Sequence, residues 1–314
     1  MENQNKSYLT PKGTFMSFVD SKIVPTLYKH ERKRIKLKSL KVFGYIISVI
    51  IFIMLSIAEM IYNLFNKDEL ETILGLSIIP SIIIHFFVTQ YVKKRKNEIL
   101  PLCFAYLGNF KNKQERITED YIKKCKIYRS WNSFDTDESF QGQFGDTGFS
   151  LLEATIKQKN RRKNKIIFSG SFIAIKMHKK VAGHSVVINC DKRSIFDQLN
   201  IFDEKHAGLE KVEIEDGEFM NEHQIYSNNQ IEVRYILTPA FIERLKELKK
   251  VFNASRIDMA FFNGYALLAV HTDNLFDTFT IDRPVTDTTI FSQFYDEMQA
   301  LGKLIDTLKI DNVH

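Results

Sequence analysis

Cysteine is scarce in this chain of 314 residues, which contains three of them in unrelated sequence contexts. Cys103, Cys125 and Cys190 form no Cys-x-x-Cys pair and no regularly spaced set. This pattern excludes a disulfide framework. We therefore expect three reduced structural thiols in a cytosolic domain.

Catalytic and cofactor motifs are also missing: no Gly-x-Ser-x-Gly, His-Glu-x-x-His or Walker-type run occurs. Gly142, Gly145 and Gly148 lie between two expected strands, whereas a phosphate-binding loop needs a strand that turns into a helix N-terminus. His178 and His184 flank an expected turn with no carboxylate at ligand spacing, so we expect exposed turn histidines. The sequence predicts no metal and no cofactor, and nothing in it indicates an enzyme.

Long apolar runs, in contrast, are present twice near the N-terminus. The first extends from Val42 to Leu64 and the second from Thr72 to Val92. Each has about the ~20 helical residues that cross ~30 Å of hydrocarbon. Only residues 66–71 separate them, so we expect a transmembrane helical hairpin with both chain ends on one side.

Basic residues flank the two runs on the side of the chain ends. Lysine and arginine in short flanks mark the cytoplasmic side of a membrane, so we expect a two-pass protein of the inner (plasma) membrane with both termini cytoplasmic. The same side chains would contact anionic lipid headgroups of the inner leaflet. The residues that we assign to this contact are Lys33, Arg34, Lys36, Lys93, Lys94 and Arg95.

The formal charge of the chain also comes from these flanks. Residues 29–41 and 93–98 sum to +9 and the whole chain to +6, so the remainder carries a net −3. A nucleic-acid-binding protein would carry its basic surface on the folded domain, so we expect no nucleic acid as partner. The long polar lead before Val42 argues against a cleaved signal peptide.

That lead has an amphipathic pattern of its own. Apolar residues spaced by three and four follow residue 14, and Pro25 interrupts them, which predicts two short helices or one kinked helix. The apolar face either lies on the bilayer surface or packs on the folded domain. The residues that form it are Phe15, Phe18, Val19, Ile23 and Leu27.

Glu59 and His85 are the acidic and basic residues inside the apolar runs, and such groups are functional candidates by default. From the cytoplasmic end, Glu59 lies ~26 Å deep in its helix and His85 ~10 Å deep in the other. We therefore expect no direct pair between them.

After the second run the pattern changes from helical to mixed. Helices are expected at 99–110 and 118–124, and strands at 138–145, 147–158, 165–177, 184–190 and 209–214. Thr238-Pro239 predicts a helix start. Asn263-Gly264 predicts a hairpin between 256–262 and 265–271, and a last helix is expected at 291–308.

These elements predict an α+β fold class: an N-terminal transmembrane helical hairpin followed by a soluble, mostly antiparallel sheet packed with two or three helices. We divide the chain into an amphipathic basic lead (1–41), the hairpin (42–92, with spans 42–64 and 72–92), membrane-proximal helices (93–129) and a cytosolic α+β domain (130–314).

Two features of the domain are candidate binding sites. Glu232 and Arg234 diverge if their segment is helical and share a face if it is extended. They form either an ion pair that fixes the Thr238 helix or, through Arg234, a site for an anionic ligand. Six basic residues surround one predicted hairpin turn and would contact lipid headgroups, Arg161 and Arg162 in particular, if that turn faces the bilayer. Otherwise they form a solvated turn. The six are Lys157, Lys159, Arg161, Arg162, Lys163 and Lys165.

Several sequence blocks occur in a recognisable order behind the apolar hairpin. Residues 134–154 read FDTDESFQGQFGDTGFSLLEA, residues 209–241 contain LEKVEIEDGEF and HQIYSNNQIEVRYILTPAF, and FFNGYALLAV follows. In these blocks the chain resembles a family of bacterial two-pass membrane proteins catalogued as a domain of unknown function. The resemblance covers most of the chain and implies the fold and the topology, but it implies no reaction.

The leading functional hypothesis is a non-enzymatic interaction or sensing module, tethered to the inner membrane, that holds a partner protein or an anionic ligand there. The alternative is a membrane-anchored hydrolase or transferase that acts on a lipid or a nucleotide. A pocket that gathers several of Glu153, Glu232, Arg234, Asp258 and His271 would favour this enzyme. A third hypothesis is a homo-oligomer whose hairpins form a channel.

Overall fold

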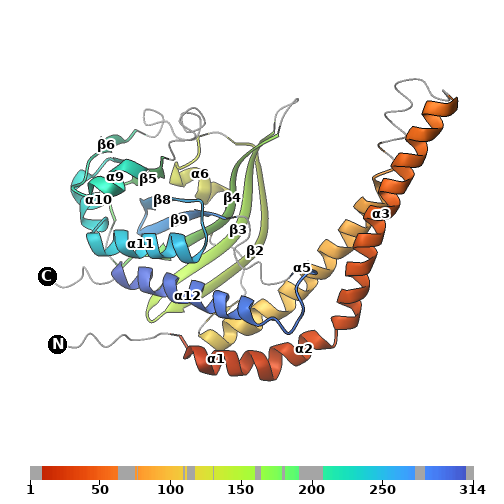
Figure 1. Cartoon of the computed structure of the whole chain (residues 1–314). Coiled ribbons are helices and arrows are strands. Elements are labelled where there is room, and N and C mark those ends of the chain that lie inside the picture. The colour runs from red at the N-terminus through yellow and green to blue at the C-terminus, as the bar shows by residue number, and fades with distance from the viewer. Residues whose placement is uncertain are drawn as a thin grey trace. The chain divides into compact units, whose positions relative to one another are not determined.

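A computed structural model describes residues 9–62, 75, 77–108, 110–111, 117–129, 131–159, 164–178, 181–190, 208–272 and 280–308 of the chain (Figure 1). It divides into two compact units. The helical unit comprises Gly13–Cys103 and Asp277–Ser292, and the sheet unit comprises Met1–Lys12, Phe104–Phe276 and Gln293–His314.

The helical unit begins with the amphipathic lead. Its helices are α1 (Lys12–Phe18), the π-helix η1 (Val19–Ile23), α2 (Val24–Tyr28), α3 (Glu31–Tyr62) and α5 (Ile79–Leu107), the last of which continues into the sheet unit. Pro25 stands in the first turn of α2, so the predicted interruption is present as a π-helical turn. Phe15, Val19, Ile23 and Leu27 are buried in the protein, which makes these side chains unavailable to a bilayer surface.

Helices α3 and α5 lie antiparallel, because contacts pair the middle of one with the start of the other. Ser48 and Ser81 share a hydrogen bond at 2.8 Å, and the Tyr91 hydroxyl donates to the His30 carbonyl at 3.2 Å. The helices approach closely at Gly44, where an added Cβ would lie 2.4 Å from the Ile84 Cδ1. Small residues at such a crossing are typical of helix pairs in membranes.

The outer surface of α3 is apolar and exposed. Its segment Glu31–Ala58 is, among the described residues, the one helix long and apolar enough to cross a membrane, and only 11% of its most apolar stretch is buried. The predicted turn at 66–71 and the start of the predicted second span at Thr72 lie outside the described residues.

The sheet unit is built on an antiparallel sheet in which the described residues form nine strands in the order β1-β2-β3-β4-β9-β8-β5-β7-β6. The strands are β1 (Phe110–Lys111), β2 (Ser133–Phe144), β3 (Thr147–Lys159), β4 (Asn164–Lys176), β5 (Ser185–Asn189), β6 (Glu210–Val212), β7 (His223–Ser227), β8 (Arg256–Phe262) and β9 (Tyr265–His271). The β8–β9 hairpin turns at Asn263-Gly264, and both residues have the positive φ (51° and 75°) that a two-residue turn of this type requires.

The helices of the sheet unit are α6 (Glu119–Cys125), α9 (Gly217–Glu222), α10 (Gln230–Ile236), α11 (Pro239–Val251) and α12 (Thr289–Thr307), of which α12 begins in the helical unit. Side-chain caps start four of them. Thr238, for example, accepts a hydrogen bond from the Phe241 amide at 3.2 Å, and Asp216 accepts one from the Phe219 amide at 2.9 Å.

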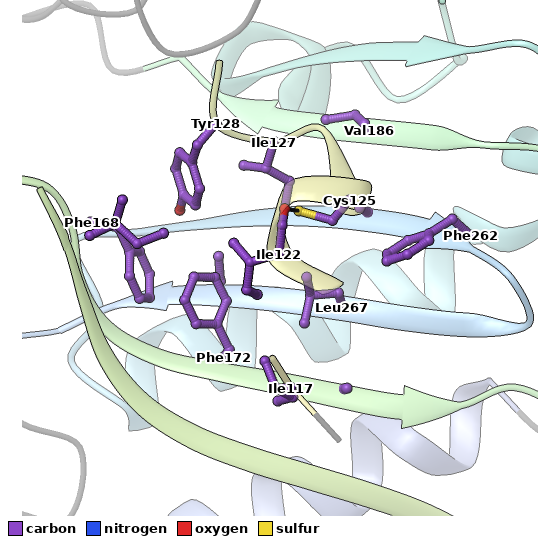
Figure 2. Packing of buried hydrophobic residues seen from close by; sticks show 14 of the residues in the cluster. Ile117, Ile122, Cys125, Ile127, Tyr128, Phe168, Phe172, Val186, Phe262 and Leu267 are labelled. Carbon is purple, nitrogen blue, oxygen red and sulfur yellow. Dashed lines mark hydrogen bonds between the residues drawn. The ribbon is translucent and has the colours of Figure 1, made fainter. Parts of the chain in front are cut away.

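The sheet is covered on both faces, as alternation along its strands requires. On one face, Ile122, Cys125 and Tyr128 pack on Phe168 and Phe172 of β4 (Figure 2). On the other, α11 and α12 lie across the strands (Figure 1). Phe241 of α11 stacks edge-on against Phe261 of β8 at 6.1 Å, and an added Cβ at Gly302 of α12 would lie 3.1 Å from the Phe144 ring.

The predicted α+β fold class is confirmed. The strands from β2 to β6, the β8–β9 hairpin, and helices α6, α11 and α12 are present within a few residues of their predicted bounds. Strands β1 and β7 and helices α9 and α10 were not predicted, so the described helices of this unit exceed the two or three expected.

Candidate functional site

A groove of about 620 Å³ lies beside the N-terminus of α11. The turn after β6 lines one part of the groove, Arg234 of α10 lines another, and the residues around the start of α11 line the rest. The groove is lined by Glu213, Ile214, Glu215, Asp216, Arg234, Leu237, Thr238, Pro239 and Ile242.

Arg234 is one wall of this groove. Its Nε donates to the Glu213 carbonyl at 3.1 Å and its Nη2 donates to Gln230 Oε1 at 3.4 Å. Three carboxylates share the groove with this single guanidinium, so like-charge repulsion opposes an anion there. The anionic ligand at Arg234 therefore stays a prediction that the acidic walls disfavour.

Glu232 does not pair with Arg234, so the expected ion pair is wrong. The segment is helical, and side chains two positions apart on a helix diverge. The Glu232 carboxylate instead accepts hydrogen bonds from the backbone amides of Ala182 and Gly183, at 2.9 and 2.7 Å, and from Asn229 Nδ2 at 3.1 Å. It thus ties α10 to the loop before β5.

Beside the groove, α10 presents two large apolar side chains to solvent. Ile231 is 79% exposed and Tyr235 is 50% exposed. They are four residues apart and therefore lie on the same helix face. Together they form a small apolar surface on α10, which also contributes Arg234 to the groove.

The basic flanks divide into two groups in the helical unit. Lys33, Lys36, Lys93 and Lys94 are exposed on α3 and α5. Arg34 and Arg95 are each only 8% exposed. Lipid contact by all six stays a prediction. Arg161 and Arg162, and the side chain of Glu59, lie outside the described residues, whereas His85 is exposed on α5.

A polar cluster missed in the sequence lies on the α6 face of the sheet. His271 Nε2 lies 2.9 Å from Asp258 Oδ2 and 3.1 Å from the Tyr128 hydroxyl, and the Asn189 amide donates to Asp258 Oδ1 at 3.0 Å. Arg256 Nε is 3.4 Å from the same carboxylate. The two-residue turn of the predicted β8–β9 hairpin fixes its register, and that register alone places Asp258 and His271 on one face.

Burial determines the protonation of this cluster. Asp258 is fully buried, which raises the pKa of its carboxyl, but the His271 hydrogen bond and the Arg256 charge outweigh burial and hold the pKa below its ordinary value. Burial lowers the pKa of His271 and outweighs the opposing Asp258 contact. The cluster is thus a carboxylate held by a neutral imidazole that donates from Nε2.

The two histidines that were predicted to lie exposed in a turn differ in their exposure. His178 is exposed, as expected, and its Nε2 lies 2.7 Å from the Thr147 hydroxyl. His184 is half-buried, stacks on the Phe262 ring at 5.2 Å, and donates from Nε2 to the Cys125 carbonyl at 2.9 Å. The expectation of an exposed residue is therefore wrong for His184, because the turn folds onto the core.

The five residues whose convergence would indicate an enzyme lie in separate places. Asp258 and His271 are together under α6, Glu232 binds the loop before β5, Arg234 lines the groove, and Glu153 pairs in register with Ser171 within the sheet. This arrangement removes the specific support for the hydrolase or transferase hypothesis.

Glu297 is a titratable group enclosed in the sheet unit. Its side chain on α12 is 5% exposed and accepts a hydrogen bond from Gln293 Nε2 at 3.0 Å. Burial raises the pKa of Glu297 to about 7; the charges of Asp296 and Glu153 act in the same direction, and the Gln293 hydrogen bond opposes them. The group therefore changes charge near neutral pH.

We expect Glu297→Gln to stabilise the folded chain at pH 8 by roughly 1–3 kcal/mol and to change little at pH 4.5. The folded state binds the Glu297 proton more tightly than the unfolded state does, so stability falls as the pH rises from 4.5 to about 7. Unfolding midpoints of the full chain across this range measure the effect. Glu210→Gln, which replaces an exposed carboxylate on β6, is the control, and equal midpoints for wild type and Glu297→Gln at pH 8 would contradict the prediction.

Fold and site together define a class: an α+β domain on an antiparallel sheet, in one chain with an apolar helix that could cross a membrane. Residues 166–310 match a family described as "Protein of unknown function (DUF3137)". The match supports the similarity to an uncharacterised family that the resemblance in residues 209–241 implied. The matched region excludes the block at 134–154.

The crystal structure of the mycobacterial trehalose monomycolate transport factor A, TtfA, is similar to 56% of this chain and 73% of its own, at 11% identity and a TM-score of 0.30. A likeness this slight implies nothing about function. No curated protein matches the sequence.

Proposed function

We propose that this chain is a two-pass inner-membrane protein, with both termini cytoplasmic, whose sheet unit is a non-enzymatic interaction or sensing module. The helical unit tethers it, and the sheet unit holds a partner protein at the bilayer.

The observation that carries this proposal is the exposed apolar surface of α3. Residues 42–62 span ~32 Å as a helix, close to the ~30 Å of hydrocarbon in a bilayer. Phe43, Met54 and Met60 are 58%, 66% and 81% exposed. Soluble proteins rarely present an apolar surface of this extent to water, so a lipid environment is the natural solvent for α3.

Helix α5 supports a second span. Its antiparallel pairing with α3 brings Ile79 to Val92 beside the apolar half of α3, and Ile82, Phe86 and Phe87 are each more than half exposed. The basic residues of both helices then fall at the same end, which favours the cytoplasmic side for that end.

The groove beside α11 supports the interaction role. Its three carboxylates favour a partner that brings basic groups, and Ile231 and Tyr235 offer apolar contacts next to it. A folded partner protein provides both kinds of group, whereas a small anion provides neither.

Protease protection in membranes tests the topology. In sealed inside-out vesicles that contain the full chain, we expect added protease to remove the C-terminal part and to leave a fragment that resists extraction by alkaline carbonate. Spheroplasts, which expose the opposite membrane face, are the matched control and should protect the C-terminal part.

Two results would overturn the proposal. Protection of the C-terminal part in inside-out vesicles would invert the topology. Release of the whole chain by carbonate would show that the apolar helices do not span the membrane.

A further inference from the structure

A small pocket in the helical unit is lined by three arginines. Its volume is about 40 Å³, and Arg34 of α3, Arg95 of α5 and Arg283 of residues 280–290 line it together with Tyr91, Val92 and Thr280. Since one water needs ~10–15 Å³ of such space, the pocket has room for about three water-sized groups. Three phosphate oxygens fit that description.

Arg34 forms the fixed wall of this pocket. It is 8% exposed, and its Nε and Nη2 donate to the two carboxylate oxygens of Glu31 at 2.8 and 2.6 Å. Its Nη1 donates to the Ile281 carbonyl at 2.6 Å. Lys41 adds a contact to Asp282 at 3.2 Å. These bonds hold residues 280–290 against α3 and thereby place Arg283 at the pocket.

Arg95 lines another part of the pocket and, within the described part of the chain, has an N–H donor that is not used in a hydrogen bond. It is 8% exposed and pairs through Nη1 with Glu98, and its guanidinium lies 5.9 Å from the centre of the Tyr91 ring. Its Nε is buried and, among the described residues, has no hydrogen-bond partner. A buried guanidinium N–H without an acceptor is costly, so this atom points to a ligand that brings an oxygen.

Arg283 supplies a further positive charge at the pocket, and it acts on Asp287, whose carboxyl pKa it helps to lower. It is exposed at the rim, and the described part of the chain offers it no hydrogen bond or ion pair. Lys33 adds a second charge nearby, 5.9 Å from the Tyr91 ring. The pKa of His30 is lowered by burial and then by the charges of Arg95 and Lys33, which is consistent with a positive potential around the pocket.

The pocket also lies at the depth of lipid headgroups, if the chain spans the membrane as proposed above. Val92 ends the apolar run of α5, and Arg95 follows one helical turn later, ~4.5 Å further along the axis. The headgroup layer of each leaflet is ~5–7 Å thick. Tyr91 at this level is typical of an interfacial aromatic side chain.

We propose that this pocket binds the phosphate group of an anionic lipid of the cytoplasmic leaflet. The Nε–H of Arg95 and the guanidinium of Arg283 donate to phosphate oxygens, while Arg34 holds the pocket open. Because residues 280–290 lead directly into α12, a bound phosphate also bridges α5 to the segment that enters the sheet unit.

Binding of soluble short-chain lipids to the full chain in a neutral detergent tests this proposal independently of topology. We expect dioctanoyl phosphatidylglycerol or dioctanoyl phosphatidic acid to raise the unfolding midpoint at least about tenfold more potently than dioctanoyl phosphatidylcholine, whose headgroup is zwitterionic. Arg283→Gln should weaken that binding by about tenfold, the expected effect of one lost charge-assisted hydrogen bond. Arg32→Gln is the matched control, since it removes one exposed positive charge of α3 that does not line the pocket.

Arg95→Lys is the second variant, because it keeps the charge and removes the Nε–H; it too should weaken lipid binding. Equal effects of Arg283→Gln and Arg32→Gln would show that general charge attraction accounts for the binding, and would overturn the proposal. Equal stabilisation by inorganic phosphate would assign the pocket to a free anion instead of a lipid. Neither result depends on the protease experiment, so the two proposals fail separately.

Discussion

Replacing Gly170 by alanine is expected to destabilise the sheet unit by roughly 3–5 kcal/mol, the sum of a strained backbone and an overpacked contact. Gly170 lies inside β4, between β3 and β9, with φ at +148°. A Cβ there would lie 2.1 Å from the Val270 carbonyl oxygen and 2.9 Å from the Thr272 amide nitrogen. Because both atoms belong to the backbone of β9 and its end, relief requires a break in the β4–β9 pairing.

The single tryptophan makes this effect measurable in the full chain. Trp131 packs on the core cluster under α6, so its fluorescence reports unfolding of the sheet unit. Gly148→Ala is the matched control: it lies in β3, and nothing stands within 4 Å of its added Cβ. We expect that variant to be neutral or slightly stabilised. A Gly170→Ala midpoint no lower than that of Gly148→Ala would contradict the argument.

Removing the Asp258 carboxylate is expected to cost about 3–5 kcal/mol, as is usual when one partner of a buried charge network is lost. Asp258→Ala leaves the Arg256 charge, the His271 N–H and the Asn189 amide without their acceptor in a buried site. Asp258→Asn keeps an acceptor oxygen and should fall between wild type and alanine. The control is Asp135→Ala, which deletes an exposed carboxylate paired with Lys157 and should cost far less stability than Asp258→Ala, because water screens an exposed ion pair.

The pH dependence of this cluster has a definite sign. Asp258 and His271 both have a pKa below the ordinary value in the folded chain, so the unfolded chain binds more protons and stability is lost as the pH falls. For His271 the loss begins near its unfolded pKa of about 6.5. Tryptophan fluorescence midpoints at pH 7.5 and 5.5 should therefore move less in a His271→Gln variant than in wild type. An unchanged acid sensitivity would argue against a neutral His271.

Acidification changes the folding stability in opposite directions at the two sites. It stabilises the sheet unit through Glu297 and destabilises it through the Asp258 cluster. Acidification relieves the buried charge at Glu297 on the α12 face, and it protonates the imidazole side of the cluster on the α6 face. The two variants separate these effects, because the two groups lie on different faces of the sheet.

The predicted elements that the structure contains are those with strong local sequence signals, such as helix caps, turn residues or a long apolar periodicity. Thr238-Pro239 provides both a cap and a first-turn proline, and Asn263-Gly264 is among the residue pairs most favoured in a tight primed turn. The last helix repeats its apolar residues over several turns. In contrast, residues 217–236 hold two short helices and a five-residue strand. Each element is too short for a helical period to be distinguished from a strand period in its sequence. The local signals for the two helices are their caps, Asp216 and Asn229.

The candidate sites also show that local sequence signals do not predict contacts between residues far apart in the chain. The sequence selected Glu232 and Arg234 as a pair by proximity along the chain, yet Glu232 binds amides 49 and 50 residues away. It grouped Arg34 with Lys33 and Arg95 with Lys94, but the structure buries the two arginines and exposes the lysines. Arg283, which completes the pocket, had no signal in the sequence at all.

Composition and local patterning are enough to predict which segments are apolar enough for lipid, where helices and tight turns begin, and that the domain alternates as an antiparallel sheet does. These properties depend on composition and on contacts between near neighbours, so they can be read along the chain. Which polar groups are buried, and which groups face them, follows from the three-dimensional fold alone. That outcome depends on residues far apart in sequence, since a buried charge persists only where distant strands and helices supply its partners.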